Sequence, residues 1–176
     1  TSIKPEISPN NGGSWSNSSV GEANDGTYAW TVPAVATAQA KVRVTAYDAG
    51  SNSAASTSAA FTITVPDATP PTVTVNAPNG GESWGIGTVH AVTWTASDNI
   101  GVSAVAIDYS ANNGGSWSPV ASGLANSGTY SWTTPGTPTA QGMIRVTASD
   151  AAANSASDVS NTVFSLADLA APTVSV

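Results

Sequence analysis

The sequence predicts an all-β protein made of two tandem copies of one module, and three observations lead to this fold class. The heptapeptide NNGGSWS occurs at residues 10–16 and again, unchanged, at residues 112–118. Charged residues make up only 9% of the chain, and its polar residues are mostly Ser, Thr, Asn and Gly, which suit short strands and tight turns better than helices. Short alternating runs of apolar and polar residues lie between turn-forming residues, as is typical of strands.

The repeat extends well beyond this heptapeptide without a gap. GTYAW at residues 26–30 corresponds to GTYSW at residues 128–132, and VRVTA at residues 42–46 corresponds to IRVTA at residues 144–148. A fixed long period indicates one structural unit that is repeated. We therefore predict three segments: a partial repeat at 1–68, a complete repeat at 69–169, and the first strand of a following repeat, or a donor strand, at 170–176.

Charge and composition exclude several classes of partner. The net charge is −7, and the only basic residues are Lys4, Lys41, Arg43 and Arg145. Four scattered cations cannot neutralise a run of phosphates, so we expect neither nucleic-acid binding nor attraction to an anionic membrane. No apolar run approaches the length of a membrane span, and no signal peptide is recognised. Cysteine is absent, which does not assign a compartment, but the few Lys and Arg residues favour the outside of a bacterial cell.

The second repeat is the more complete, and its first strands can be predicted in order. Residues 72–75 alternate and form strand A, and residues 76–87 form a turn-rich connection. Residues 90–96 alternate again and form strand B. Its residues expected to face the core are Val92, Trp94 and Ala96.

Four more strands follow at residues 104–109 (C), 129–133 (E), 143–149 (F) and 161–166 (G). A hairpin turn is expected after strand C, where Asn and Gly tolerate positive φ, and Trp117 opens the next short strand. The residues of strands C and F expected to face inward are Val105, Ile107, Tyr109, Ile144, Val146 and Ala148. Seven short strands separated by turns argue for an immunoglobulin-like β-sandwich.

The ends of the chain are out of phase with this module. Residues 1–10 align with residues 103–112, so the first sandwich is expected to lack strands A and B. The last six residues, 171–176, repeat residues 70–75 and read as a stray strand A. Two explanations stay open: the chain is an excerpt of a longer array, or the last strand of one copy completes the first domain of the next by strand addition.

Three motifs resemble the tandem bacterial immunoglobulin-like domains of large secreted and surface-anchored proteins. They are DATPPTVTV at residues 67–75, ASDNIGV at 96–102 and VTASDAAANS at 146–155. PNGGESW at 78–84 and the hairpin at 107–117 resemble a related set of extracellular repeats. The resemblance covers essentially the whole chain. It implies a non-catalytic extracellular module, and such modules serve as adhesin stalks, spacers and enzyme appendages.

One candidate ligand site in the second repeat is a calcium site. In an immunoglobulin-like sandwich the B–C loop, the F–G loop and the segment leading into strand A lie at one end, and some related adhesin repeats bind calcium there. The residues brought together would be Asp67, Asp98, Asn99, Asp150 and Asn154. Hard cations prefer such oxygen ligands. The alternative is that these residues only form turns, and Ala153, where family members often have Gly, argues against a site.

The six tryptophans suggest either a core or a sugar-binding surface. Trp15 and Trp117 recur at equivalent places, as do Trp30 and Trp132, so we expect these four and Trp94 to fill the cores. Trp84, in the A–B connection, is the best candidate for an exposed ring that stacks on a carbohydrate.

No constellation of catalytic residues is recognised. His90 is the only histidine and is expected to face solvent, and the three glutamates are too scattered for a glycosidase pair. We therefore predict a structural module, the stalk or shaft of a bacterial surface or secreted repeat protein of adhesin-like or fibre-forming type. The first alternative is a carbohydrate-binding accessory module of a secreted hydrolase. The second is a filament subunit that assembles by strand complementation, with copies of itself as partners.

Overall fold

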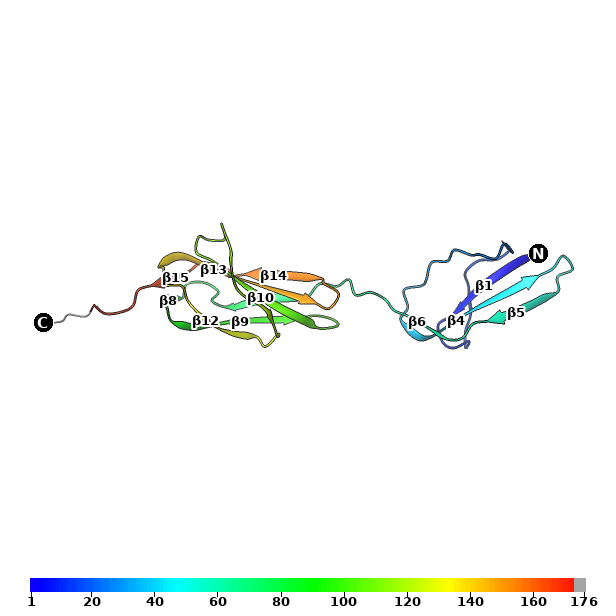
Figure 1. Ribbon diagram of the computed structural model, residues 1–176, viewed down its shortest axis with the longest axis horizontal. Coiled ribbons are helices and arrows are strands. Elements are labelled where there is room, and N and C mark those ends of the chain that lie inside the picture. Colours follow the sequence, from blue (N-terminus) through cyan, green and yellow to red (C-terminus); the bar gives the residue numbers. More distant parts are fainter. Residues whose placement is uncertain (173–176) are drawn as a thin grey trace. The chain divides into compact units, whose positions relative to one another are not determined.

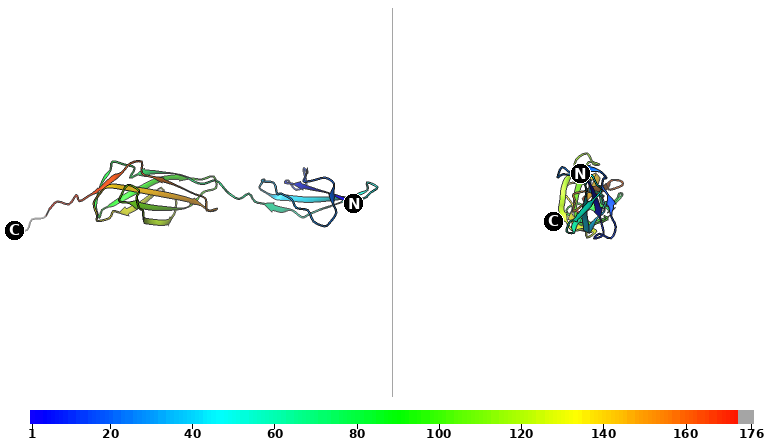
Figure 2. Two further views of the ribbon diagram at one scale, coloured as in Figure 1. Left: turned by 90° about the horizontal axis from the view of Figure 1, so that it is seen from above. Right: turned by 90° about the vertical axis from the view of Figure 1, so that its right-hand side faces the viewer.

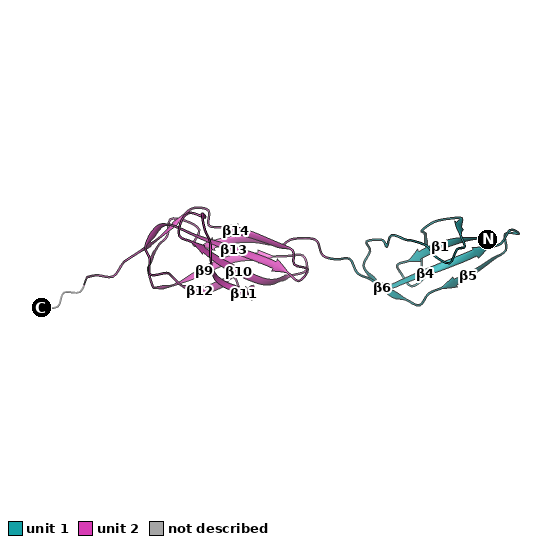
Figure 3. Cartoon of the chain, turned by 45° about the horizontal axis from the view of Figure 1, so that its top comes forward, with its two compact units in different colours: residues 1–66 teal, residues 67–176 magenta. Residues whose placement is uncertain are grey.

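A computed structural model describes residues 1–172 and divides the chain into two compact units, Thr1–Pro66 and Asp67–Val176 (Figure 3). Every regular element in residues 1–172 is a β-strand, so the expected all-β fold is confirmed. That part of the chain accordingly holds no helix with the length and apolarity needed to cross a membrane. The predicted strand at 171–176 falls mostly on residues outside this description.

Unit 2 is a sandwich of two sheets whose strands run side by side along the unit (Figures 1 and 2). The smaller sheet is antiparallel in the order β12-β9-β7, formed by β7 (Thr72–Ala77), β9 (Val89–Ser97) and β12 (Thr129–Thr133). The larger sheet has the order β11-β10-β13-β15-β8, with β14 also paired to β13. Its strands are β8 (Ser83–Gly85), β10 (Val102–Ser110), β11 (Ser118–Leu124), β13 (Thr139–Asp150), β14 (Ser155–Val159) and β15 (Phe164–Ala167). This is an immunoglobulin-like arrangement.

The core of unit 2 lies between the two sheets and follows the predicted alternation. Successive side chains of a strand point to opposite faces, so every second residue is buried. Of the inward residues expected for strands B, C and F, all but Ala96 are at most 8% exposed: Val92, Trp94, Val105, Ile107, Tyr109, Ile144, Val146 and Ala148. Ala96 is partly buried and packs against them. Phe164 and Leu166 of β15 complete this core.

Two predicted elements of unit 2 differ from the structure. The connection at 76–87 contains β8, which pairs parallel with β15 and matches Trp84 with Leu166. The single strand predicted at 161–166 is wrong in its bounds, because this part of the chain forms β14 and then β15 in succession. Both strands pair with β13, and Ser160 interrupts them by donating its hydroxyl to the carbonyl of Pro78 (2.7 Å). These pairings join distant segments, so local patterns do not reveal them.

Unit 1 contains one sheet of six strands, with the order β2-β1-β4-β5, β3 paired to β1 and β6 paired to β4. The strands are β1 (Ser2–Ser8), β2 (Ser16–Asn17), β3 (Glu22–Ala23), β4 (Thr37–Tyr47), β5 (Ser53–Thr57) and β6 (Phe61–Ile63). They correspond to the larger sheet of unit 2. Residues 1–66 contain no counterparts of β7, β8 and β9, and the lack of strands A and B in this part of the chain was expected.

One segment of unit 1 shows what this absence does to its fold. Residues 27–31 match β12 in sequence, yet they form no strand. In unit 2, β12 exists because all its residues from Thr129 to Thr133 pair with β9. Without a counterpart of β9 the backbone of residues 27–31 has no ladder to join. The same sequence therefore has a different local structure in the two units.

The prediction that Trp15 and Trp117 fill the cores is wrong. Both are half-buried, and the guanidinium carbons of Arg43 and Arg145 lie 4.3 and 4.5 Å from the centres of their respective rings. Arg145 alternates with the inward-pointing Ile144 and Val146, so it lies on the opposite face of the sheet. The two repeats nevertheless have the same arrangement at this place. Arg43 forms an ion pair with Glu6 (2.7 Å), and Arg145 forms one with Asp108 (2.9 Å).

Candidate metal centre

Three aspartates of unit 2 lie together at one end of its sandwich. Asp67 precedes β7, Asp98 follows β9, and Asp150 ends β13. One carboxylate oxygen from each lies within 4.8 Å of the other two. The topology therefore brings together three of the five predicted ligands by their carboxylates, and the two asparagines lie beside them.

Asp150 is held by the turn that joins β13 to β14. Its two carboxylate oxygens accept hydrogen bonds from the main-chain nitrogen (2.9 Å) and side-chain amide (2.8 Å) of Asn154. Ala153 has φ of 69°, in the left-handed region that favours glycine. The turn thus keeps the conformation that a glycine would favour although an alanine occupies the position. Asp150 as a whole residue is only 4% exposed.

One carboxylate oxygen of Asp98 has hydrogen-bond partners in residues 1–172 and the other has none there. Oδ2 accepts hydrogen bonds from the main-chain nitrogens of Ile100 (2.8 Å) and Gly101 (2.9 Å). Oδ1 is shielded from solvent and has no hydrogen-bond partner among the described residues. An anionic oxygen in this state is costly unless a donor or a cation reaches it.

The two asparagines hold the aspartates through their amide nitrogens. Asn99 donates to Oδ1 of Asp67 (3.2 Å). Asn154 donates to Asp150 and also to the main-chain oxygen of Asp67 (3.2 Å). The expectation from sequence was that both amides supply oxygen to a cation. In this arrangement the two amides position the carboxylates instead. Their hydrogen bonds also tie Asp67 to unit 2. The predicted boundary at 68 had placed Asp67 in the preceding segment.

The carboxylate cluster fits a hard divalent cation. Calcium binds oxygen at about 2.3–2.6 Å, so two ligands of one ion lie at most about 5 Å apart, which the three carboxylates satisfy. Their charges are also otherwise uncompensated, because Arg145 is the only Lys or Arg in residues 67–176 and it pairs with Asp108 (2.9 Å). The unpartnered Oδ1 of Asp98 is the atom that a bound cation would satisfy.

Unit 1 repeats only part of this arrangement. Asp48 and Asn52 reproduce the turn after β13, with the Asn52 amide 2.8 Å from Oδ2 of Asp48 and Ser51 at φ of 64°. The hydrogen bonds from Asn52 lower the pKa of Asp48. Residues 1–66 contain no counterpart of Asp98. Unit 1 therefore provides a natural control for the three-carboxylate site.

The predicted sugar-stacking residue, Trp84, does not present a free ring. His90 stacks on it with a ring separation of 4.3 Å and an angle of 3° between planes. Phe164 and Trp132 lie 5.5 and 6.3 Å away, and Trp84 packs on the core of unit 2. The prediction that His90 faces solvent is also wrong, because its ring stacks on that of Trp84.

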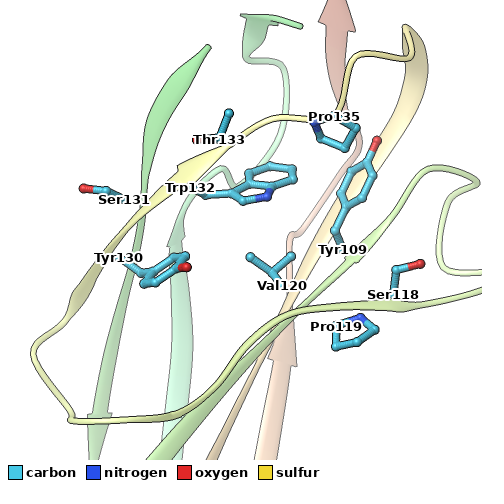
Figure 4. Close-up of a pocket in the computed structure, with 9 residues that line it drawn as sticks. All are labelled: Tyr109, Ser118, Pro119, Val120, Tyr130, Ser131, Trp132, Thr133 and Pro135. Atoms are coloured by element: carbon cyan, nitrogen blue, oxygen red, sulfur yellow. The ribbon is translucent and has the colours of Figure 1, made fainter. Parts of the chain in front are cut away.

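A groove of about 390 Å³ lies where β11 and β12 leave the edge of the sandwich open (Figure 4). Its walls include Tyr109, Tyr130 and Trp132. Tyr109 and Trp132 are only 8% and 6% exposed, so Tyr130 is the one half-buried ring among the three. Carbohydrate stacking needs an open aromatic face, and this groove offers little of one.

The hydrogen bonds of Asp150 make the stability of unit 2 depend on pH. Burial favours the protonated form, but the hydrogen bonds from the side chain and main chain of Asn154 and from the main chain of Ala152 outweigh it, so the pKa of Asp150 lies below its ordinary value. Between that lowered value and the ordinary pKa of about 3.9, the unfolded chain binds more protons than the native one. The stabilisation is therefore complete above about pH 4 and is lost as the pH falls through the native pKa.

We expect the urea midpoint of unit 2 to fall between about pH 6 and about pH 3, and Asp150→Asn to reduce this dependence, because the variant has no carboxylate to protonate. Urea titrations at several pH values, followed by amide exchange of β13, measure the effect. Asp48→Asn changes the equivalent turn of unit 1 and should leave the unit 2 midpoint unaltered. An unchanged pH dependence in the Asp150 variant would contradict the assignment.

Comparison with known proteins gives a structural likeness. No protein-family model and no curated protein matches the sequence. Among solved structures, the chain is similar to the fibronectin(III)-like modules of Clostridium thermocellum CbhA, with a TM-score of 0.47 and 18% identity over 98% of this chain and 83% of that chain. An identity this low transfers no residue roles.

Proposed function

We propose that the chain is a non-catalytic structural part of an extracellular bacterial repeat protein, and that calcium fastens the first segment of unit 2. The stalk or shaft of a surface or secreted protein is the role that fits best. The observation that carries the proposal is the convergence of Asp67, Asp98 and Asp150, together with the unpartnered Oδ1 of Asp98. Repetition of one module, few basic residues and abundant Ser and Thr support the same role.

Calcium at this cluster would join three separate segments of unit 2. Asp67 lies on the segment that leads into β7, whereas Asp98 and Asp150 lie on loops that follow β9 and β13. A cation held by all three restrains that leading segment against both sheets of the sandwich. Restraint of this kind is useful in a load-bearing module and requires no reaction.

Calcium is therefore expected to stabilise unit 2. Extracellular calcium sites have dissociation constants of about 10⁻⁴–10⁻³ M, so about 10 mM calcium should add about 1.4–2.7 kcal/mol to the free energy of unfolding. The melting temperature of unit 2 should rise by several degrees relative to a sample in EGTA. Isothermal titration calorimetry on the whole chain should give one site.

Two variants separate this site from general effects of calcium. Asp98→Asn keeps the shape of the side chain but removes its charge, and it should weaken calcium binding at least tenfold. Asp48→Asn alters the matching turn of unit 1, beside which residues 1–66 hold no counterpart of Asp98, and should leave binding unchanged. The proposal fails if the wild-type chain shows neither binding heat nor a melting shift, or if both variants behave alike.

The carbohydrate-binding alternative has weaker support. His90 covers the Trp84 ring, and two of the three rings in the groove beside β12 are buried. A structural role is the better account of this aromatic content, since Trp84, Tyr109, Trp132 and Phe164 pack against one another in unit 2.

A further inference from the structure

The groove beside β12 in unit 2 presents hydrogen-bond donors that the protein itself does not use. It has a volume of about 390 Å³ and is open because β11 and β12 are each the last strand of their sheet. Three aromatic donors line it: the hydroxyls of Tyr109 and Tyr130 and the indole nitrogen of Trp132 (Figure 4). None of the hydrogen bonds formed within residues 1–172 involves these three groups.

Two of these donors belong to side chains that are otherwise buried. Tyr109 is 8% exposed and Trp132 is 6% exposed, and their ring centres lie 5.0 Å apart. Burial raises the pKa of Tyr109, and no hydrogen bond opposes this effect. Within residues 1–172, Oδ1 of Asp98 is the only side-chain donor or acceptor that lacks a partner and is also sealed from solvent. The donor atoms of Tyr109 and Trp132 are therefore accessible although their ring faces are covered.

The lining of the groove defines the chemistry of a ligand. Its aromatic side chains offer donors, so the ligand must supply acceptors. Its residues are only Tyr, Trp, Ser, Thr, Pro and Val, so no charged side chain would pair with an ionic ligand. The volume falls in the range of small ligand sites, about 300–1,000 Å³. A sugar would need an open ring face for stacking, and the two most deeply placed rings present their donor atoms instead.

A proline-rich peptide in the polyproline II conformation meets these requirements. This helix has no internal hydrogen bonds, so all its carbonyl oxygens are free to accept one. Proline has no N–H group, so it leaves no donor unpaired in a groove that is itself rich in donors. Its rings can pack on Pro119, Val120 and Pro135, which also line the groove. The conformation is formed before binding, so little entropy is lost when the peptide docks.

We propose that this groove binds a neutral, proline-rich peptide segment of another polypeptide in the polyproline II conformation. The hydroxyls of Tyr109 and Tyr130 and the indole N–H of Trp132 donate hydrogen bonds to its carbonyl oxygens. The groove belongs to unit 2 alone and is lined by none of the three clustered aspartates, so the inference is independent of calcium binding.

Unit 1 has a corresponding groove with fewer free donors. It has a volume of about 440 Å³, and its lining residues occupy the equivalent positions. Ile7 stands in place of Tyr109, and the hydroxyl of Tyr28 donates to the main-chain oxygen of Ser18 (3.1 Å). Only the tryptophan remains of the three donors, so we expect one peptide site per chain, in unit 2.

The test titrates the whole, isotope-labelled chain with a blocked peptide of about ten prolines and follows the indole N–H resonance of Trp132 by NMR. We expect this resonance to shift with a dissociation constant of about 1 mM or less. Tyr109→Phe keeps the ring and removes the hydroxyl, so it should weaken binding about three- to tenfold, the usual effect of one hydrogen bond. Tyr28→Phe is the matched control in unit 1 and should leave binding unchanged.

Three results would overturn the proposal. The first is an unshifted Trp132 resonance at about 10 mM proline peptide, ten times the weakest expected dissociation constant. The second is equal binding by wild type and Tyr109→Phe, when the amide spectrum of the variant shows that its fold is intact. The third is an equal or larger shift of the Trp132 resonance with a blocked Gly/Ser peptide of the same length or with a cello-oligosaccharide. That result would assign the groove to any extended chain or to a sugar.

Discussion

Replacing Trp132 with alanine should lower the free energy of unfolding of unit 2 by about 3–5 kcal/mol, the usual cost of removing a large buried aromatic side chain. Trp132 is 6% exposed, and its ring lies 5.0 Å from that of Tyr109 and 6.5 Å from that of Phe164. The substitution removes these contacts and leaves a cavity that the sandwich cannot fill by relaxation. Urea denaturation followed by circular dichroism measures the loss, and exchange of β13 amides assigns it to unit 2.

Trp30→Ala at the equivalent position of unit 1 is the matched control. Trp30 is half-buried and packs on the small cluster of Ile7, Ala40 and Ile63. Truncating Trp30 removes less buried apolar surface than truncating Trp132. The expected loss in the free energy of unfolding is therefore at most about half of that at Trp132. Equal losses at the two positions would mean that the core of unit 1 is closed like that of unit 2.

Gly80→Ala should be the most damaging change in the loops of unit 2, with an expected loss of about 2–5 kcal/mol. Gly80 has φ of 125°, and a Cβ atom there would lie 2.0 Å from Oγ1 and 3.1 Å from the main-chain nitrogen of Thr162. The loop is also fixed by Glu82, whose carboxylate accepts hydrogen bonds from the main-chain nitrogens of Asn79 and Gly80 at 2.8 Å each. It therefore has little freedom to move away.

Gly81→Ala provides the comparison for that variant. Gly81 also has positive φ, 85°, but a Cβ atom there meets nothing within 4 Å. Only the backbone conformation disfavours alanine, so the expected loss is about 1 kcal/mol. Thermal melts of both variants measure the difference. Similar losses would show that the close approach to Thr162 contributes little.

The candidate site was predictable only in part. Asp67, Asp98 and Asp150 could be placed together because an immunoglobulin-like sandwich gathers its B–C and F–G loops at one end. The direction in which the asparagine amides point was not predictable, since it depends on hydrogen bonds that only the folded loops create. The unpartnered oxygen of Asp98 was likewise invisible, because its shielding from solvent is a property of packing.

The amino-acid sequence by itself determined the repeated module, the β-class and the inward residues of its central strands. These follow from period-two alternation and from turn chemistry, which act between residues that are near in the chain. Only the tertiary structure decided that β8 pairs with β15, that Trp117 lies over Arg145, and that residues 27–31 form no strand although β12 does. The physical reason is that a strand needs hydrogen-bond partners from a distant segment, and a local pattern cannot state whether that segment is present.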